Sequence, residues 1–328
     1  MSRFGASAPG KLMLAGEYVV LDGAPALVAA VDRRALANWA PARNDSRLIG
    51  RNSAETTALP PEALLARTLA ERRLHPVPHE LTLDVSALRS GDRKLGLGSS
   101  AAGAAAVAGA VFAFAGRDIT RPDVRREVLD VALEGHQTVA PQGSGADVAA
   151  SVLGGFVRFR RLDAERVEAE PTPWPGELHA RVVWTGTEAR TSELVARVRA
   201  LEANDPSTYA DRMGMLRAAS EAMVEAFAAG DAPGVVEAAG AHHQAMAALG
   251  EASGAPIVES RLAQVAELAR ASGGAAKPSG AGGGDVSIAF FADGSATRSF
   301  DDQCRNAGLT PVELRLGAEG TTPLSSAS

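Results

Sequence analysis

The chain has 328 residues, of which 46% are hydrophobic and 22% are charged, and its net charge is −6. This composition is typical of a soluble globular protein, and the length suits two compact domains. The negative charge argues against a dominant nucleic-acid or membrane surface, since either needs clustered positive charge. The single cysteine, Cys304, cannot form an internal disulfide, and the first residues lack the apolar core of a signal peptide. We therefore expect a cytoplasmic protein that binds neither nucleic acid nor a membrane.

The first half of the chain mixes strand-like and helical patterns. Strand-like runs lie at 26–31, 81–85 and 152–158, and helical patterns lie at 61–73, 101–115 and 122–139. A proline-rich stretch at 171–176 interrupts both periodicities. We therefore predict an N-terminal α/β domain over residues 1–170.

The second half groups its helical patterns together. They lie at 191–203, 207–229, 233–249 and 257–271, with strand-like runs at 178–184, 285–291 and 311–316. This arrangement predicts an α+β domain over residues 171–328. The last part of it, 318–328, is of low complexity and is expected to be a disordered tail.

The central signal is the glycine-rich segment KLGLGSSAA at 94–102, which leads into a run of small apolar residues. Small residues let backbone N–H groups close around an anion, and the N-terminus of the following helix adds a positive dipole. The spacing fits neither a Walker A loop nor a dinucleotide-binding fingerprint. The segment therefore predicts a phosphate cradle, with an ordinary glycine turn and serine cap as the alternative.

Two further glycine-rich segments lie near the ends of the chain. Residues 8–23, APGKLMLAGEYVVLDG, contain a strand-like core at 11–14, and residues 277–287, KPSGAGGGDVS, lead into the apolar run 288–291. Lys11 could point into a cleft or be a solvated lysine at the end of a strand. The second of these segments could approach a ligand closely or form a flexible hairpin.

Together, the order PGKxxLxGEYxVLxG, then GLGSSAA, then GAGGGD resembles the three motifs of the GHMP kinase superfamily, from residue 8 to about residue 291. The resemblance implies a two-domain fold with an N-terminal α/β domain, a C-terminal ferredoxin-like α+β domain and the active site between them. It implies transfer of the γ-phosphoryl group of ATP to a small acceptor, with Mg²⁺. The residues implied to bind the ATP phosphates are Gly96, Leu97, Gly98, Ser99, Ser100, Ala101 and Ala102.

Asp147 follows a helix-ending segment with a proline and two glycines, and could simply cap the next helix. In sugar and mevalonate kinases of the superfamily a similar GxD element supplies the catalytic aspartate, so the resemblance implies that Asp147 and Lys11 are catalytic. It also implies that Ser100 and Glu134 hold Mg²⁺. The histidines His136, His242 and His243 lack a metal-site spacing, and we interpret them as structural or exposed residues.

Local features favour an acceptor that already carries a phosphate. Lys94 before GLGSSAA, the stretch GSGADVAA and the stretch WTGTEARTS at 184–192 resemble phosphomevalonate kinases more than mevalonate kinases. Lysines could neutralise the roughly two extra negative charges of a phosphomonoester. The predicted acceptor-binding residues are Lys11, Lys94, Ser144, Thr191, Ser192, Lys277, Ser279, Gly280, Ala281 and Gly282.

The predicted acceptor is 5-phosphomevalonate. The alternatives are a mevalonate kinase and a non-catalytic ATP-binding homologue, although the joint presence of Lys11, Ser100 and Asp147 speaks against the latter. Lys94 has its own alternative as a surface lysine beside Arg93. We expect a monomer or a homodimer.

Overall fold

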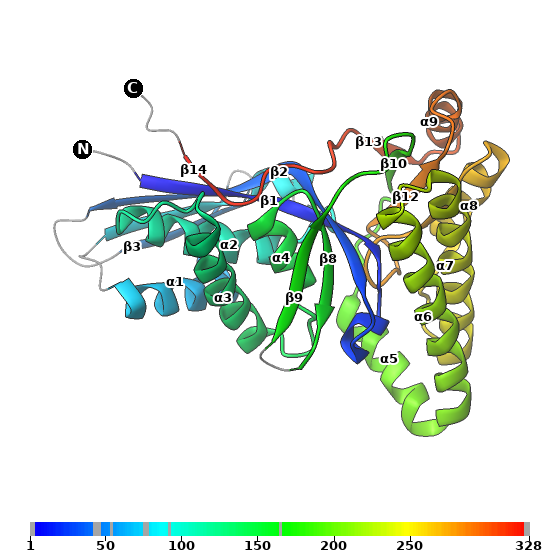
Figure 1. Ribbon diagram of the computed structural model, residues 1–328, viewed down its shortest axis with the longest axis horizontal. Coiled ribbons are helices and arrows are strands. Elements are labelled where there is room, and N and C mark those ends of the chain that lie inside the picture. The colour runs from blue at the N-terminus through cyan, green and yellow to red at the C-terminus, as the bar shows by residue number, and fades with distance from the viewer. Residues whose placement is uncertain are drawn as a thin grey trace. The chain divides into compact units, whose positions relative to one another are not determined.

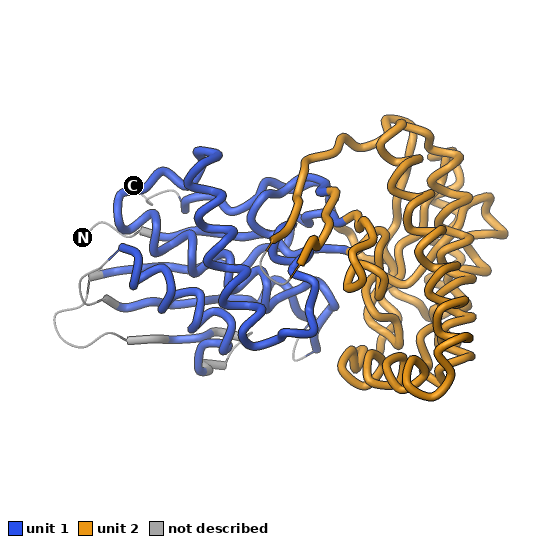
Figure 2. Tube along the Cα trace, turned by 60° about the horizontal axis from the view of Figure 1, so that its bottom comes forward, with its two compact units in different colours: residues 1–12, 28–157, 315–328 blue, residues 13–27, 158–314 orange. Residues whose placement is uncertain are grey.

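The computed structural model describes residues 4–41, 47–52, 55–74, 79–90, 93–163 and 166–324. The chain forms two compact units (Figure 2): unit 1 comprises residues 1–12, 28–157 and 315–328, and unit 2 comprises residues 13–27 and 158–314. This division differs from the single predicted boundary at residue 170. The proline-rich stretch lies partly in a strand, β9 (Val167–Thr172). Residues 13–27, predicted for the N-terminal domain, belong to unit 2, and residues 315–328, predicted for the C-terminal domain, belong to unit 1.

The larger sheet has eight strands. Six of them lie in the order β14 (Thr322–Pro323), β1 (Phe4–Ala15), β2 (Ala26–Pro41), β5 (His79–Asp84), β3 (Arg47–Asn52) and β4 (Glu55–Thr57). β8 (Phe156–Arg161) pairs with β2 and with β9. β2 and β5 are antiparallel, with Leu36 opposite Asp84, whereas β3 and β5 are parallel.

Four helices of unit 1 accompany this sheet: α1 (Pro61–Leu74), α2 (Ser99–Phe114), α3 (Pro122–Val139) and α4 (Ala146–Leu153). Figure 1 shows α1, α2 and α3 on one face of the sheet. Every residue of α2 from Ala101 to Phe112 is buried, because its small side chains allow neighbouring elements to approach it from all sides. A strand was predicted at 152–158, but its first two residues belong to α4, and β8 begins only after Gly154 and Gly155.

The C-terminal end differs from the prediction of disorder. β14 pairs with β1, with Thr322 opposite Ser7. The Arg34 guanidinium donates hydrogen bonds to the carbonyl oxygens of Glu319 at 2.7 Å and Gly320 at 2.6 Å. These contacts order 318–324, and the remaining part of the predicted tail, 325–328, lies outside the described residues.

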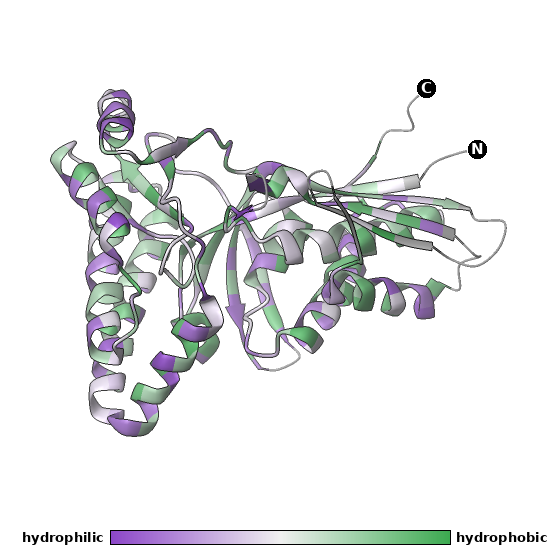
Figure 3. Cartoon of the chain, turned by 180° about the vertical axis from the view of Figure 1, so that it is seen from behind, coloured by the Kyte–Doolittle hydropathy of each residue, from purple (hydrophilic) through white to green (hydrophobic). Residues whose placement is uncertain are grey.

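Unit 2 contains a four-stranded antiparallel sheet in the order β11 (Ala275–Pro278), β12 (Val286–Phe291), β10 (His179–Trp184) and β13 (Thr310–Val312). Its helices are α5 (Thr191–Asn204), α6 (Pro206–Ala228), α7 (Ala232–Ser253), α8 (Ser260–Ala271) and α9 (Ala296–Asn306). α6 and α7 form a long pair (Figure 1). Hydrophobic and hydrophilic residues alternate along these two helices (Figure 3). The sequence patterns did not predict β11 or α9.

Helix starts in unit 2 follow from side-chain capping. The carboxylates of Asp205 and Asp231 accept hydrogen bonds from backbone N–H groups in the first turns of α6 and α7. Glu259 accepts from the N–H groups of Arg261 and Leu262, so α8 begins at Ser260 rather than at the predicted residue 257. Among the described residues, none of the helices combines the length and the apolar character that a membrane span needs.

Candidate functional site

The segment 96–102 of unit 1 has the geometry of an anion cradle. Gly96 and Gly98 adopt the left-handed conformation, with φ of 74° and 73°, and α2 begins at Ser99 directly afterwards. The N-cap residue of α2 is Gly98, which has no side chain to accept from the N–H groups of the first turn. The first N–H groups of a helix have no partner within the helix, and they carry the positive end of its dipole. These N–H groups can therefore bind phosphate oxygens.

Lys11 lies directly against this cradle. Its backbone N–H donates to the carbonyl oxygen of Leu97 at 2.8 Å, which ties β1 to the segment. A Cβ atom added to Gly98 would lie 2.9 Å from Cγ of Lys11, so the lysine side chain crosses over the glycine. The structure thus brings Lys11 and the predicted phosphate-binding segment together.

Ser100, His136 and Asp147 form a group at the start of α2. The Ser100 hydroxyl lies 3.3 Å from Nε2 of His136, and the same nitrogen lies 3.7 Å from Oδ2 of Asp147. His136 is buried in the last turn of α3, whereas the Asp147 side chain is 27% exposed in the first turn of α4. The histidine therefore lies between the predicted Mg²⁺ ligand and the predicted catalytic carboxylate.

The alternative that Asp147 caps α4 has limited support. Ser144 Oγ accepts a hydrogen bond from the N–H of Ala146 at the start of this helix. Among the described residues, the N–H that donates to Asp147 Oδ1 is that of the next residue, Val148, at 3.0 Å. Oδ2 of Asp147 lies on the His136 side of a carboxylate that remains partly exposed.

Glu134 lies away from this group. It is two positions before His136 on α3, which places the two side chains about 200° apart around the helix. Its carboxylate is 53% exposed and lies 3.6 Å from the Arg73 guanidinium. The predicted pairing of Glu134 with Ser100 as a Mg²⁺ site is therefore not supported by the geometry. Over the part of the chain that the structure describes, no group of three or more His, Cys, Asp or Glu side chains could hold a metal ion.

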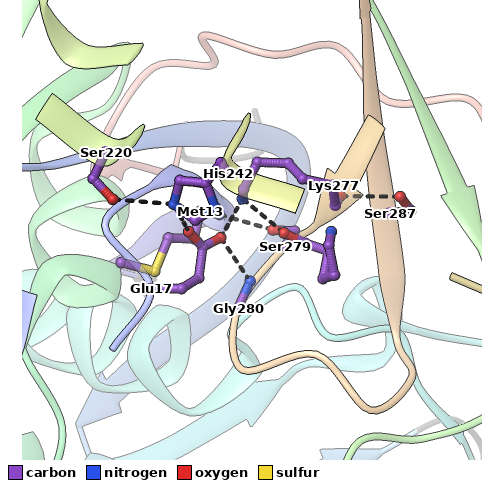
Figure 4. A network of polar contacts seen from close by, with 9 residues as sticks. Met13, Glu17, Ser220, His242, Lys277, Ser279, Gly280 and Ser287 are labelled. Carbon is purple, nitrogen blue, oxygen red and sulfur yellow. Dashed lines mark hydrogen bonds and ion pairs between the residues drawn. The ribbon is translucent and has the colours of Figure 1, made fainter. Parts of the chain in front are cut away.

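The third glycine-rich segment lies in unit 2 and corrects the prediction for Lys277. Lys277 belongs to β11, is fully buried, forms an ion pair with Glu17 and donates to the carbonyl oxygen of Pro278 at 2.7 Å (Figure 4). An ammonium group enclosed in this way is not available to neutralise a substrate phosphate. Ser279 and Gly280 are also engaged: the Ser279 hydroxyl accepts from the N–H of Met13, and the Gly280 N–H donates to Glu17.

Of the other predicted acceptor-binding residues, Lys94, Thr191 and Ser192 are exposed, Ser144 and Ala281 are partly buried, and Gly282 is buried. Lys94 is exposed in β7 (Arg93–Lys94), which pairs with β6 (Arg89–Ser90) in unit 1. Thr191 and Ser192 are exposed at the start of α5 in unit 2, where helix N–H groups are available. Their contact with an acceptor stays a prediction.

Comparison with known proteins places these features in a family. Residues 65–155 match the family described as GHMP kinases N terminal domain, and residues 223–306 match GHMP kinases C terminal. A phosphomevalonate kinase from Streptomyces sp. (strain CL190) is 32% identical, over 95% of this chain and 97% of that protein. The chain belongs to the GHMP kinase family. A mevalonate kinase from Aeropyrum pernix is 30% identical, over 90% of this chain and 91% of that protein.

Solved structures confirm the predicted two-domain GHMP kinase fold. Streptococcus pneumoniae phosphomevalonate kinase in complex with phosphomevalonate and AMPPNP has a TM-score of 0.80 at 20% identity, over 95% of this chain and 99% of that chain. The Lin0012 protein from Listeria innocua has a TM-score of 0.86 at 22% identity, over 98% of this chain and 99% of that chain.

His136 is the site residue of this GHMP kinase that sequence reasoning missed. We interpreted it as a structural histidine because its spacing fits no metal motif. The available signal was its position: it precedes the stretch containing Asp147 and ends a helix that packs beside α2 and α4. Only the structure shows that the intervening residues fold so as to bring it to Ser100.

Two glycine substitutions can distinguish the effect of backbone strain on stability from the effect of the cradle on nucleotide binding. Gly98 and Gly116 both have positive φ, but a Cβ atom at Gly116 would meet no atom within 4 Å. We expect Gly98→Ala and Gly116→Ala each to lower the free energy of unfolding by about 1–2 kcal/mol, the cost of a left-handed alanine. Only Gly98→Ala should also weaken nucleotide binding, by about tenfold, because it displaces Lys11 and the first N–H groups of α2.

Urea unfolding would give the stabilities of the two variants, and titration with an ATP analogue would give their affinities. Equal nucleotide affinity in both variants would contradict the assignment of the cradle.

Proposed function

We propose that this GHMP kinase is a phosphomevalonate kinase, which transfers the γ-phosphoryl group of ATP to the phosphate of 5-phosphomevalonate and forms 5-diphosphomevalonate in the mevalonate route to isoprenoids. The observation that carries the kinase chemistry is the grouping of Lys11, Ser100, His136 and Asp147 around the segment 96–102. The choice of acceptor rests on the likeness to the Streptomyces enzyme over nearly the whole chain and on the residues around Lys94 and 184–192.

Phosphoryl transfer is catalysed mainly by positioning and by positive charge, because charge develops on the oxygens of the transferred group. The first N–H groups of α2 would bind the ATP phosphates, and Lys11 would place an ammonium beside them. Mg²⁺ bound to the phosphates would neutralise their charge. We assign the Ser100 hydroxyl, which lies 3.3 Å from Nε2 of His136 at the cradle, as the side-chain oxygen that would bind this ion.

Asp147 would orient the attacking oxygen of the acceptor. A phosphate acceptor is already ionised at neutral pH, so it needs orientation more than deprotonation. His136 would hold the Ser100 hydroxyl and the Asp147 carboxylate in fixed positions, since its ring is buried between them. The new bond joins an acceptor phosphate oxygen to the γ-phosphorus, and the bond from the γ-phosphorus to the bridging oxygen of ADP breaks.

A mevalonate kinase is the second candidate, because mevalonate kinases of several organisms also match the chain. A coupled assay that follows ADP formation with phosphomevalonate, mevalonate and homoserine side by side separates the two functions. We expect the highest kcat/KM with phosphomevalonate. A preference for mevalonate would select the second candidate, and activity with none of the three would reject both.

Asp147→Asn should lower turnover and leave ATP binding nearly unchanged, because in this proposal the carboxylate orients the acceptor and does not bind the ATP phosphates. General bases typically contribute about 10²–10⁴-fold, and we expect the lower end because the acceptor is ionised. Steady-state kinetics and titration with an ATP analogue would measure the two effects. Unchanged turnover in a folded variant would remove Asp147 from the reaction, and loss of folding would support the capping role instead.

Lys94→Ala tests the charge of the acceptor. If the Lys94 ammonium binds the acceptor phosphate, its loss should lower kcat/KM for phosphomevalonate by about tenfold, or about 1.4 kcal/mol, with little change in ATP binding. The loss should be larger at low ionic strength, because Lys94 is exposed and salt screens its charge. Arg93→Ala is the matched control on the neighbouring exposed residue. The same kcat/KM in wild type and Lys94→Ala would contradict this role.

A further inference from the structure

A buried set of contacts in unit 2 has no part in the proposed reaction. Three hydrogen bonds join residues 13–18 to the start of the third glycine-rich loop, in the same order along both segments. The Met13 N–H donates to the Ser279 hydroxyl at 2.9 Å, and the Gly280 N–H donates to Oε1 of Glu17 at 3.2 Å. The Tyr18 hydroxyl donates to the carbonyl oxygen of Ala281 at 2.6 Å.

Glu17 is held from several sides (Figure 4). Its side chain is 1% exposed, and Oε1 accepts from both Lys277 and the Gly280 N–H. Oε2 lies 3.2 Å from Nε2 of His242 on α7, which in turn lies 3.0 Å from the Ser220 hydroxyl on α6. Burial, with the Lys277 charge as a second cause, lowers the pKa of His242 well below its usual value, so the ring is neutral at pH 7. One negative and one positive charge therefore balance within the network.

Tyr18 has an unusual backbone conformation. Its φ of 62° with ψ of −55° is strained for a bulky residue, and such a conformation persists only when the surroundings impose it. Its side chain is almost fully buried. Burial, and to a smaller extent the charge of Glu17, raise the pKa of its hydroxyl, so the group remains a hydrogen-bond donor. The strain is thus associated with a contact to the loop.

Some backbone N–H groups of the loop 279–284 donate to acceptors within the chain, and others do not. Gly283 N–H donates to the carbonyl oxygen of Ile257, and Asp285 N–H donates to that of Thr187. Within the described residues, the N–H groups of Ala281, Gly282 and Gly284 donate to no atom of the chain, and those of Ala281 and Gly282 directly follow the Gly280 N–H that Glu17 accepts from. Glu17 and Tyr18 bind the residues on either side of the Ala281 N–H, at the Gly280 N–H and the Ala281 carbonyl.

We propose that Glu17 and Tyr18 are positioning residues that hold the loop 279–284 so that the N–H groups of Ala281 and Gly282 face a phosphate group of the acceptor. Neither side chain touches the substrate. Glu17 acts through the Gly280 N–H, and Tyr18 acts through the Ala281 carbonyl oxygen. This inference rests on the proposed function for the identity of the acceptor, but the loop geometry can be tested without it.

Tyr18→Phe removes one hydroxyl and keeps the ring. The chain has two tyrosines, and Tyr209→Phe on α6 is the matched control. We expect Tyr18→Phe to raise KM about tenfold for the best acceptor of the three-substrate assay, with ATP KM within about twofold and the melting temperature within about 3 °C of wild type. Tyr209→Phe should leave all three unchanged. Equal losses for ATP and acceptor, or no loss for either, would overturn the proposal.

Glu17 needs paired substitutions, because removing one partner leaves a buried charge without its counterion. Glu17→Gln with Lys277→Met removes both charges and retains an amide oxygen that can accept from Gly280. Glu17→Leu with Lys277→Met removes that acceptor too. We expect acceptor KM within about twofold of wild type in the first double variant and about tenfold higher in the second. The same KM in both double variants would overturn the role of Glu17.

Amide hydrogen exchange gives a readout that does not depend on catalysis. Exchange at 279–284 should be about tenfold faster in Tyr18→Phe and in the leucine double variant than in wild type, while α6 and α7 keep their protection. If the wild-type protein phosphorylates none of the acceptors, the proposed function fails and this exchange alone decides the positioning role. Unchanged exchange at 279–284 would overturn it.

Discussion

A carboxylate loses several kcal/mol of hydration when it is buried, and it is tolerated only where charges and hydrogen bonds replace the lost water. Glu17 is such a group, and much of unit 2 is arranged around it. Lys277 on β11 supplies the counterion, Gly280 supplies a backbone donor, and α7 supplies a neutral histidine. Each of these groups comes from a different element, so the contacts of one carboxylate join a strand, a helix and a loop, although Oε2 has no hydrogen-bond partner among the described residues. The same requirement explains why Lys277 cannot serve a substrate.

The glycine-rich segment of unit 1, residues 96–102, is arranged differently from the third loop in unit 2. The start of α2 is a set of backbone donors that the described side chains do not cap, next to the Lys11 side chain. In unit 2 a protein carboxylate accepts from one N–H group of the third loop, and among the described residues the N–H groups of Ala281, Gly282 and Gly284 have no acceptor. The two segments look alike in composition, but the first leads into a helix whose N-cap is a glycine, whereas one N–H group of the second donates to a carboxylate of the chain itself. Small residues therefore allow another group to approach the backbone closely, but they do not predict whether that group is a ligand or part of the chain.

Helices with clear periodicity and caps could be predicted from the sequence. α3 was predicted at 122–139 and lies at Pro122–Val139, and α5, α6 and α7 began within one residue of their predicted positions. α9 was missed because its buried residues, Thr297, Phe300 and Cys304, are few and lie among polar ones. The C-terminal strand was missed because its order comes from partners distant in the sequence, β1 and the Arg34 guanidinium, which no local pattern reveals.

The sequence predicted which residues belong to the site better than it predicted which side chains each of them contacts. The motifs located Lys11, Ser100 and Asp147 in the sequence, and the structure brings these residues of unit 1 to one place. The roles of Glu134, His136 and Lys277 depended on which way each side chain faces. For Glu134 and His136 the difference is two positions on one helix, which turns one side chain to Arg73 and the other to Ser100. Residue type cannot distinguish these outcomes.

The choice of acceptor depends on charge outside the catalytic group. Ser100, His136 and Asp147 could orient either an alcohol or a phosphate oxygen, so they do not discriminate between mevalonate and its phosphate. The chain has three lysines, and the burial of Lys277 against Glu17 leaves Lys11 and Lys94. Lys11 lies at the ATP-phosphate cradle and would serve either acceptor. If lysine charge selects the acceptor, as we propose, the residue that would do so is Lys94, and because Lys94 is exposed, its contribution would depend on salt more than the contributions of the buried groups do.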